Sequence, residues 1–387
     1  MLNANYKSVL DYIENYWPKI TFSVKHNTLF RIAVPFPFVA PNHTFFRLDL
    51  FYWDSYFIIL GLVASSRMAL ARDIVENLIY LFRKFGMVPQ RNRWINISRT
   101  NPPFLSQMAY AVYAKDGDRE WLHKVIAVAK EEYRKVWGGK ERFVREIGLN
   151  RYSSFPPSHI LAEHESGWDM TSRFRGQCRN VIPVDLNCLL YKYETDFADE
   201  AKISGSAAEE KFWRGEADKR RYLVNKFLWD EKEGFFFDYN FVEKRKIPFK
   251  TLAAYYALWS GIASQEQSLA LVQSLSVFET SSGLTNTEKS LSFRKQWDWP
   301  NGWPNQIWIA VKGLLDYGYE SEAKRIAQKW LDLNVRVFKE TGALWEKYDV
   351  VSGDIGKSGL YPTQPGFGWT NAVFLKLLEL FPDLGEN

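Results

Sequence analysis

Apolar residues recur every three or four positions along most of the chain, the spacing that gathers them on one face of an α-helix. The clearest example runs from Met68 to Phe85 and is followed by Gly86, a residue that commonly ends a helix. Another segment opens with Pro102 and Pro103, and proline fits the first turn of a helix. The periodicity predicts about twelve helical segments. One of them begins just after Asp54 and runs through Leu62, and the others have approximate bounds of 3–17, 68–86, 102–115, 118–137, 183–199, 207–229, 249–262, 265–275, 303–318, 320–339 and 369–381.

The connections between these helices show a second pattern, in which long and short segments alternate. The long connections are aromatic, polar and marked by glycine and proline, whereas the short ones carry no unusual residues. Residues 18–50 and 138–168 are predicted to be extended or loop-like. Strand-like alternation is limited to short pieces such as 234–239. We therefore predict an all-α protein, a closed ring of helix pairs whose long loops gather at one end.

The composition favours one large folded unit. The chain has 387 residues, of which 46% are hydrophobic and 25% are charged, and this balance supports a large core. No linker, low-complexity tract or shift in composition divides the sequence. We expect a single domain over residues 1–387, in which residues 1–50 form a helix and an extended loop that pack on the ring.

Charge and hydropathy exclude several classes of partner and location. The net charge is +5 with both signs interspersed, so no nucleic acid partner is expected. No stretch approaches the ~18 consecutive apolar residues of a membrane span, and no membrane partner is expected. The first sixteen residues carry charges and lack the apolar run of a secretory signal, so we expect a cytoplasmic protein. Cys178 and Cys188 are expected to be buried free thiols.

Four acidic residues stand beside tryptophan or glycine in the loops, and they are the main candidates for chemistry: Asp54, Asp169, Asp298 and Glu346. Asp169 ends the segment Glu165-Ser166-Gly167-Trp168-Asp169. Flat aromatic rings suit the apolar face of a sugar, and cleavage of a glycosidic bond uses two carboxyl groups. In an inverting enzyme one protonates the leaving oxygen and the other activates a water, at a separation of about 6.5–9.5 Å.

Simpler interpretations of the same residues stay open at this point. Asp54 and Asp298 each precede a predicted helix and could be helix N-caps. Glu346 could be a surface residue that pairs with Lys347, and the loop arginines could form ordinary surface ion pairs. The five histidines are scattered, and no third ligand accompanies His159 and His164, so no metal site is expected.

Taken together, these loops resemble the trehalases of glycoside hydrolase family 37 over nearly the full length, from about Trp17 to Phe381. The similar motifs occur in order along the chain. They are Phe51-Tyr52-Trp53-Asp54-Ser55-Tyr56-Phe57, Ser98-Arg99 with Pro102-Pro103, Glu165-Ser166-Gly167-Trp168-Asp169, Ile182-Pro183-Val184-Asp185-Leu186-Asn187, Gln296-Trp297-Asp298-Trp299-Pro300-Asn301-Gly302-Trp303, Glu346-Lys347-Tyr348-Asp349-Val350 and Gly366-Phe367-Gly368-Trp369-Thr370-Asn371.

The resemblance implies an (α/α)6 barrel and the inverting hydrolysis of a small disaccharide, α,α-trehalose, to two glucose molecules, with no cofactor. It also implies that Asp169 is the general acid and Glu346 the general base. Substrate contacts are expected from Trp53, Asp54, Asn92, Arg93, Arg99, Arg151, Trp168, Trp297 and Asp298.

Two segments depart from the family pattern. Trehalases usually carry Gly-Gly-Arg-Phe-Arg-Glu before Tyr-Trp-Asp, whereas residues 42–49 here read Asn-His-Thr-Phe-Phe-Arg-Leu-Asp, so at least one substrate-contacting arginine is displaced. In the glycine-containing segment 353–368, which resembles the lid of the family, Leu360 replaces a carboxylate. These changes keep other functions open: a hydrolase of a related α-glucoside such as glucosylglycerate, or a sugar-binding protein without catalysis. A barrel isomerase or epimerase would need catalytic histidines in the pocket.

Overall fold

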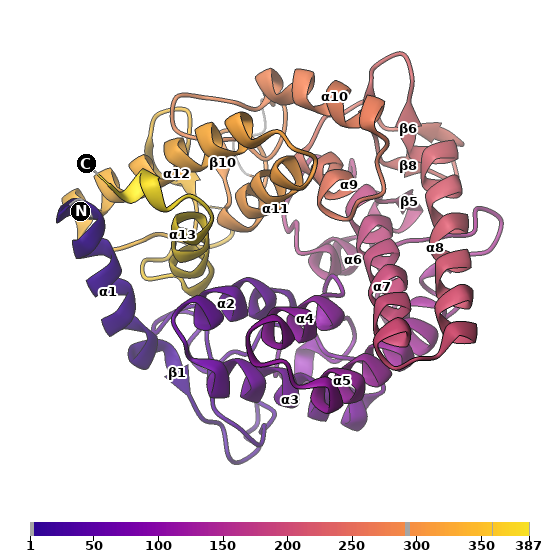
Figure 1. Cartoon of the computed structure of the whole chain (residues 1–387), viewed down its shortest axis with the longest axis horizontal. Coiled ribbons are helices and arrows are strands. Elements are labelled where there is room, and N and C mark those ends of the chain that lie inside the picture. The colour runs from indigo at the N-terminus through magenta and orange to yellow at the C-terminus, as the bar shows by residue number, and fades with distance from the viewer. Residues whose placement is uncertain (1–3, 291–294, 358, 387) are drawn as a thin grey trace.

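The structure is a computed structural model that describes residues 4–290, 295–357 and 359–386. Its described residues form thirteen α-helices, arranged as a ring (Figure 1). Six of them lie in the inner layer and follow one another around the ring until the last packs against the first. These are α2 (Tyr52–Ala64), α4 (Leu105–Asp116), α7 (Val184–Ile203), α9 (Tyr256–Trp259), α11 (Pro304–Asp316) and α13 (Gly368–Leu380).

The outer layer covers the inner one, and most outer helices pack against an inner helix that adjoins them in the chain. Its members are α1 (Ala4–Ile20), α3 (Met68–Phe85), α5 (Arg119–Glu132), α8 (Ala207–Leu228), α10 (Gln265–Gln273) and α12 (Glu320–Thr341). Six inner and six outer helices make the (α/α)6 barrel that the family resemblance predicts. The remaining helix, α6 (His159–Ser166), belongs to a long loop.

The sequence pattern explains which helix takes which layer. In α2, every residue from Tyr52 to Val63 is buried, so this helix is surrounded by protein on all sides. In α12, by contrast, the buried residues recur at the helical spacing from Ala323 to Val337, while charged residues occupy the opposite face. The inner helix α2 is thus buried around its whole circumference, whereas the outer helix α12 is buried along one stripe only.

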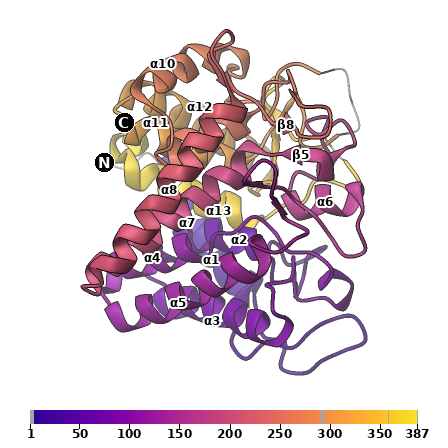
Figure 2. The same cartoon turned by 90° about the vertical axis from the view of Figure 1, so that its right-hand side faces the viewer.

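The long loops gather at one end of the ring, on the right-hand side of Figure 2, together with α6 and short strands such as β5 (Val181–Ile182) and β8 (Tyr239–Asn240). The named strands have two residues each, and antiparallel pairs such as β10 (Asn301–Gly302) with β11 (Tyr348–Asp349) join one loop to another. The remaining strands are β1 (Thr21–Phe22), β2 (Phe38–Val39), β3 (Phe143–Val144), β4 (Leu149–Asn150), β6 (Trp229–Asp230), β7 (Phe235–Phe236), β9 (Arg245–Lys246) and β12 (Asp354–Ile355).

Most predicted helices are confirmed, including the one that ends at Gly86, whose backbone is left-handed with φ of +71°. Three details differ. The fourth helix begins at Leu105, so Pro102 and Pro103 precede it instead of forming its first turn. The predicted loop 138–168 contains α6, because the Ser158 side chain caps its first turn. Within the predicted helix 249–262, only Tyr256–Trp259 is α-helical, and it follows the 3₁₀ turn Leu252–Tyr255.

Three further expectations concern single residues and the membrane. Cys178 and Cys188 are both free and buried, as predicted. Asn3, the first residue of the first predicted helix, lies outside the described residues. Within the described ranges, no helix combines the length and the apolar composition needed to cross a bilayer.

A buried carboxyl group ties four helices together. Glu132, the last residue of α5, accepts hydrogen bonds from the hydroxyls of Tyr52 on α2 and Tyr193 on α7, at 2.8 and 2.9 Å. The backbone N–H of Leu105, where α4 begins, donates to the Tyr193 hydroxyl at 2.8 Å. Burial raises the pKa of Glu132 to about 7, although the two tyrosine hydroxyls lower it.

We expect the free energy of unfolding to fall by on the order of 3 kcal/mol as the pH rises from 4.5 to about 7 because of Glu132. The unfolded carboxyl ionises near 4.5 while the folded one keeps its proton, so the stabilisation is complete at low pH and is lost through the folded pKa. Glu132→Gln keeps an oxygen acceptor and should remove this pH dependence in urea unfolding curves. Glu120→Gln, on the exposed face of α5, is the control. An unchanged pH slope in Glu132→Gln would contradict the assignment.

Candidate active site

A cavity opens among the long loops. It encloses about 850 Å³, including the open space at its mouth. Its wall draws residues from five stretches of the sequence, namely 41–54, 90–99, 164–169, 297–303 and 346–369. Segments far apart in the chain therefore meet here because the ring brings its loops to the same end.

Stacked tryptophans build the inner end of this cavity. Trp297 and Trp303 lie face to face, with ring centroids 3.9 Å apart and planes within 2°. Trp53 and Trp168 each tilt against Trp297 at 5.5 Å, and Trp369 meets Trp303 edge-on at 5.6 Å. All five rings are at most 4% exposed. Four of them face the cavity, whereas Trp168 lies behind its wall. We refer to these five residues as the tryptophan cluster.

Gly167 allows two wall segments to approach each other. It ends α6 in left-handed backbone with φ of +78°, a conformation that glycine adopts readily. A Cβ atom at this position would lie only 2.5 Å from the Trp53 ring. The position therefore needs glycine for its backbone and for its lack of a side chain, and this contact fixes Asp169, two residues further on, relative to α2.

Glu346 is buried at the cavity wall with both carboxylate oxygens bonded. The Lys347 ammonium forms an ion pair with Oε2 at 2.9 Å, and the Tyr361 hydroxyl donates to Oε1 at 2.7 Å. The side chains of Glu346 and Lys347 are 1% and 0% exposed. The indole N–H of Trp369 also donates to the backbone carbonyl of Glu346 at 3.1 Å. Lys347 and Tyr361 therefore hold the carboxylate in one orientation, and Trp369 holds the backbone that carries it.

Asp169 is more accessible, with 26% of its side chain exposed. Its Oδ2 lies 3.4 Å from Nδ1 of His164, one turn earlier on α6. Its backbone carbonyl accepts a hydrogen bond from the Gln296 amide at 2.6 Å. Asp169 thus presents a carboxyl group to the cavity from a backbone that a second loop holds in place.

That second loop runs along the segment that follows Asp169. The backbone N–H of Trp297 donates to the backbone carbonyl of Met170 at 3.3 Å. Asp298, which is fully buried, accepts from the Thr171 hydroxyl at 2.8 Å and from the Ser172 N–H at 2.9 Å. Asp298 therefore positions the loop that carries Asp169 from behind the cavity wall.

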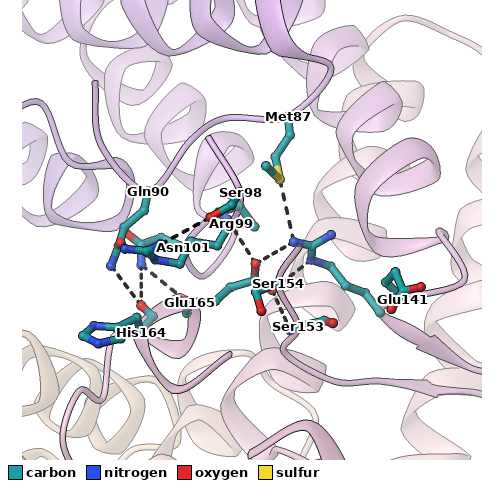
Figure 3. Close-up of polar contacts among 12 residues, drawn as sticks. Met87, Gln90, Ser98, Arg99, Asn101, Glu141, Ser153, Ser154, His164 and Glu165 are labelled. Carbon is teal, nitrogen blue, oxygen red and sulfur yellow. Dashed lines mark hydrogen bonds and ion pairs between the residues drawn. The ribbon is translucent and has the colours of Figure 1, made fainter. Parts of the chain in front are cut away.

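On the other side of Asp169, a buried ion pair fixes the end of α6 (Figure 3). Arg142 donates two hydrogen bonds to the Glu165 carboxylate, at 2.8 and 2.6 Å, and Glu165 is fully buried. The backbone N–H groups of Thr100 and Ser153 also donate to this carboxylate, at 3.0 and 2.9 Å. One carboxylate thereby joins α6 to the loops that carry Arg99 and Ser153.

Two carboxyl groups of the cavity act on a third, Asp54. Burial raises the pKa of Asp54 well above its usual value, and the charges of Glu346 and Asp169 raise it further. The backbone N–H of Asp54 and the Arg91 guanidinium lower this pKa. A buried carboxyl that keeps its proton can both donate and accept hydrogen bonds, which suits contact with sugar hydroxyls.

Two arginines complete the polar side of the wall. Burial lowers the pKa of Arg99, with a further lowering by Arg91 and an opposing effect of the Asp169 charge. Arg99 donates through Nε to the Gln90 side chain at 2.8 Å, and the Gln90 amide donates to the His164 carbonyl at 3.0 Å. Arg91 pairs with Asp49 at 3.2 Å. The cationic groups are thus held in a network that reaches the residue next to Glu165.

The structure brings six of the predicted site residues to the cavity wall: Trp53, Asp54, Arg99, Asp169, Trp297 and Glu346. Trp168 and Asp298 lie directly behind it. Trp168 is fully buried, and the Arg173 guanidinium lies over its ring, 4.7 Å from the centroid. Arg173 in turn forms ion pairs with Asp185 and Asp238.

The other three predicted residues lie away from the wall and have protein partners. Asn92 is fully buried and accepts from the Leu50 N–H at 2.8 Å. Arg93 forms a two-point ion pair with buried Asp49, at 2.7 Å for each contact. Arg151 donates to the backbone carbonyls of Glu141 and Arg179, both at 2.9 Å.

The simpler interpretations of the acidic residues are wrong. The N-cap of α2 is Phe51 and that of α11 is Trp303, so neither Asp54 nor Asp298 caps a helix. Glu346 does pair with Lys347, but in the interior and not at the surface.

Several wall residues were not among those predicted: Gln90, Arg91, His164, Trp303, Tyr361 and Trp369. Trp303 and Trp369 stand inside the quoted motifs, so the motifs themselves contained the signal. His164 precedes Glu165 directly, and only the turn of α6 shows that its ring lies beside Asp169. Ser358, in the segment compared with the family lid, lies outside the described residues.

Comparison with known proteins gives a consistent result. The family model described as Trehalase matches residues 2–159 and 157–382. The cytosolic neutral trehalase of Beauveria bassiana is 32% identical, over 89% of this chain and 58% of that protein. A cytosolic neutral trehalase of Saccharomyces cerevisiae is 31% identical, over 89% of this chain and 57% of that protein. The chain thus spans somewhat more than half the length of these curated relatives.

Solved structures extend the comparison to the fold. The neutral trehalase of S. cerevisiae superposes with a TM-score of 0.81 at 29% identity, over 90% of this chain and 75% of that one. A mannosylglycerate hydrolase of glycoside hydrolase family 63 from Thermus thermophilus superposes with a TM-score of 0.72 at 19% identity, over 96% and 100% of the two chains. The second likeness concerns the fold alone.

We expect Arg142→Met to lower the free energy of unfolding by about 3–5 kcal/mol, because it leaves the Glu165 carboxylate buried without its counter-ion. Urea unfolding at pH 7 measures the loss. Arg145→Met, three residues along and exposed, provides the matched control. Equal stability of the two variants would contradict a central role for the Arg142–Glu165 pair.

Proposed function

Because the chain belongs to the trehalase family, we propose that it is an inverting glycoside hydrolase that cleaves α,α-trehalose into two glucose molecules. The proposal rests on one observation: Asp169 and Glu346 line the same cavity, and tryptophans form the inner end of that cavity. This cavity combines aromatic surface for a sugar ring with two carboxyl groups, which hydrolysis of a glycosidic bond requires.

In the proposed reaction, Asp169 donates its proton to the glycosidic oxygen, and Glu346 accepts a proton from a water molecule. The oxygen of that water attacks the anomeric carbon from the face opposite the leaving group, so the configuration at this carbon inverts. The glucose unit that the water attacks is released as the β-anomer, and the glucose unit that forms the leaving group keeps its α configuration. The bonds from Lys347 and Tyr361 suit Glu346 to the role of the base, since they fix its direction.

For substrate binding, we propose that Trp53 and Trp297 supply the aromatic surface and that Asp54 and Arg99 bond the sugar hydroxyls, because all four line the cavity. The other predicted contacts act indirectly in this proposal, through the protein groups they hold. They are Asn92, Arg93, Arg151, Trp168 and Asp298.

The proposal also covers the organisation and location of the protein. We infer one catalytic domain over residues 1–387, since the inner helices close the ring with α13 beside α2 and α1 packs against α12 and α13. Relatives named cytosolic neutral trehalases support a cytoplasmic location. No cofactor takes part in the proposed reaction, in which both proton transfers use side chains of the chain itself.

Asp169→Asn and Glu346→Gln should each lower kcat on trehalose by about 10³-fold or more, because each removes one proton transfer while keeping the shape of the side chain. Glucose release by the purified variants measures the effect, and circular dichroism verifies the fold. Asp218→Asn on α8 and Glu340→Gln on α12 are matched surface controls. Wild-type activity in either cavity variant would rule out its assigned role.

The stereochemical outcome separates this mechanism from its alternatives. Proton NMR of trehalose at early times of hydrolysis should show one β-glucose and one α-glucose per molecule cleaved. Two α-anomers before mutarotation would indicate retention and overturn the assignment of Glu346 as a base. Calorimetric binding of trehalose without any turnover would indicate a sugar-binding protein.

A further inference from the structure

Two arginines of the cavity wall are influenced by the charge of Asp169. Burial lowers the pKa of Arg91, and the negative charges of Asp49 and Asp169 oppose this effect. Burial also lowers the pKa of Arg99, where Asp169 again acts in the opposite direction. Asp169 is the proposed proton donor, and it protonates the oxygen that departs with the leaving group. Arg91 and Arg99 therefore lie near the part of the cavity in which the leaving group is released.

Arg91 has only a share of one carboxylate. Its partner Asp49 is fully buried and also pairs with Arg31 at 3.4 Å and with Arg93 at 2.7 Å. Arg93 contacts both carboxylate oxygens, whereas Arg91 makes one contact of 3.2 Å and donates through Nε to the neutral side chain of Asn96. Three guanidinium groups thus surround one negative charge, and Arg91 is the one of the three that lines the cavity.

Arg99 has no carboxylate partner among the described residues. Its Nε donates to the Gln90 side chain at 2.8 Å and its Nη1 to the Ser98 hydroxyl at 3.3 Å, and both acceptors are neutral. The Glu165 carboxylate, which lies behind this loop, is already paired with Arg142. The charge of Arg99 is therefore held in place by hydrogen bonds but is not neutralised.

Other buried arginines show the effect of a complete set of carboxylate partners. Burial acts against the charge of Arg142, but the charge of Glu165 raises its pKa above the usual value. Burial acts against the charge of Arg173 as well, but its pKa is raised well above the usual value by its partners, Asp185 and Asp238. The two cavity arginines show the opposite direction, which is expected for guanidinium groups that lack a full negative partner.

The carboxyl groups of the cavity do not offset this positive charge during the proposed reaction. Glu346 is paired with Lys347. Asp169 has to carry a proton in order to donate it. Burial raises the pKa of Asp54 well above its usual value and favours its neutral form. His164 also lines the cavity and adds positive charge whenever its ring is protonated. The side of the cavity that carries Asp169 therefore has an excess of positive charge in the reactive state.

We propose that Arg91 and Arg99 form an anion-binding subsite beside the proton donor Asp169, so that the enzyme also hydrolyses α-glucosides whose leaving group is a short hydroxy acid. A guanidinium group binds a carboxylate through strong, charge-assisted hydrogen bonds. The inference rests on the proposed α-glucosidase function and adds a substrate class to it. Arg91 is the specificity-determining residue, because Arg99 is also expected to bond the hydroxyls of a neutral sugar.

The reaction on such a substrate is a balanced hydrolysis. The bond between the anomeric carbon and the oxygen of the hydroxy acid breaks, and that oxygen takes the proton from Asp169 to become a free hydroxyl group. The water oxygen bonds to the anomeric carbon and the water gives a proton to Glu346, which yields β-glucose. The carboxylate of the leaving group stays unchanged throughout.

Carboxymethyl and hydroxyethyl α-D-glucopyranoside provide the test. Their leaving groups, glycolate and ethylene glycol, have the same length and differ mainly in charge. We expect kcat/KM for the carboxymethyl glucoside to exceed that for the hydroxyethyl glucoside by about 10-fold or more, because a guanidinium group bonds a carboxylate more strongly than a hydroxyl. Arg91→Met should bring this ratio down toward one, since it removes one of the two cations.

Arg31→Met is the matched control. It removes a guanidinium group from the same Asp49 carboxylate but lies outside the cavity wall, so it should keep the wild-type ratio. In Arg91→Met the two-point pair between Arg93 and Asp49 remains, and circular dichroism verifies the fold. Inhibition of trehalose hydrolysis by glycolate and by ethylene glycol tests the wild-type subsite without any variant, and glycolate should be the stronger competitive inhibitor.

The outcomes distinguish this inference from the proposed function. Cleavage of trehalose with a charged-to-neutral ratio near one, with neither glucoside cleaved, or with glycolate no stronger than ethylene glycol as an inhibitor would overturn the inference and leave the trehalase proposal intact. A high ratio that Arg91→Met does not lower would also overturn it. Absence of turnover on trehalose and on both glucosides would overturn the proposed function itself.

Discussion

The closure of the inner helical ring is the constraint on which the rest of the structure depends. The inner helix α2 is buried around its whole circumference and has no face left for polar chemistry except at its end. Because the ring is packed along its length, its functional groups can stand only where the helices give way to loops. The long loops gather at one end, so five distant stretches of sequence share one cavity.

Charged groups that loops bring into a protein interior need partners, and here the partners also fix the positions of the residues around the cavity. Glu165 is satisfied by Arg142 and two backbone N–H groups, and Glu346 by Lys347 and Tyr361. Each carboxylate would be costly to bury alone. The same bonds that offset this cost also fix the direction of neighbouring cavity residues, so stability and orientation have one physical origin.

Much of the fold could be predicted from the sequence because apolar periodicity is a local property. Helices such as α3 and α12 carry the pattern over many turns, and both are found where it predicts them. The eight-residue α6 is too short for periodicity to reveal. In the site, motif residues such as Trp53 and Glu346 reach the cavity, whereas Arg93 turns to Asp49. Arg91 and Arg93 both pair with Asp49, yet only Arg91 lines the cavity, and local sequence does not contain that choice.

The tryptophan cluster has an optical consequence. Its five indoles are close to a third of the 16 tryptophans in the chain, and four of them face the cavity. Indole emission responds to nearby water and charge, and a sugar that settles on these rings displaces water from them. We therefore expect the fluorescence of the unlabelled protein to change when the cavity is occupied, so that binding and release could be followed in stopped-flow experiments without a modified substrate.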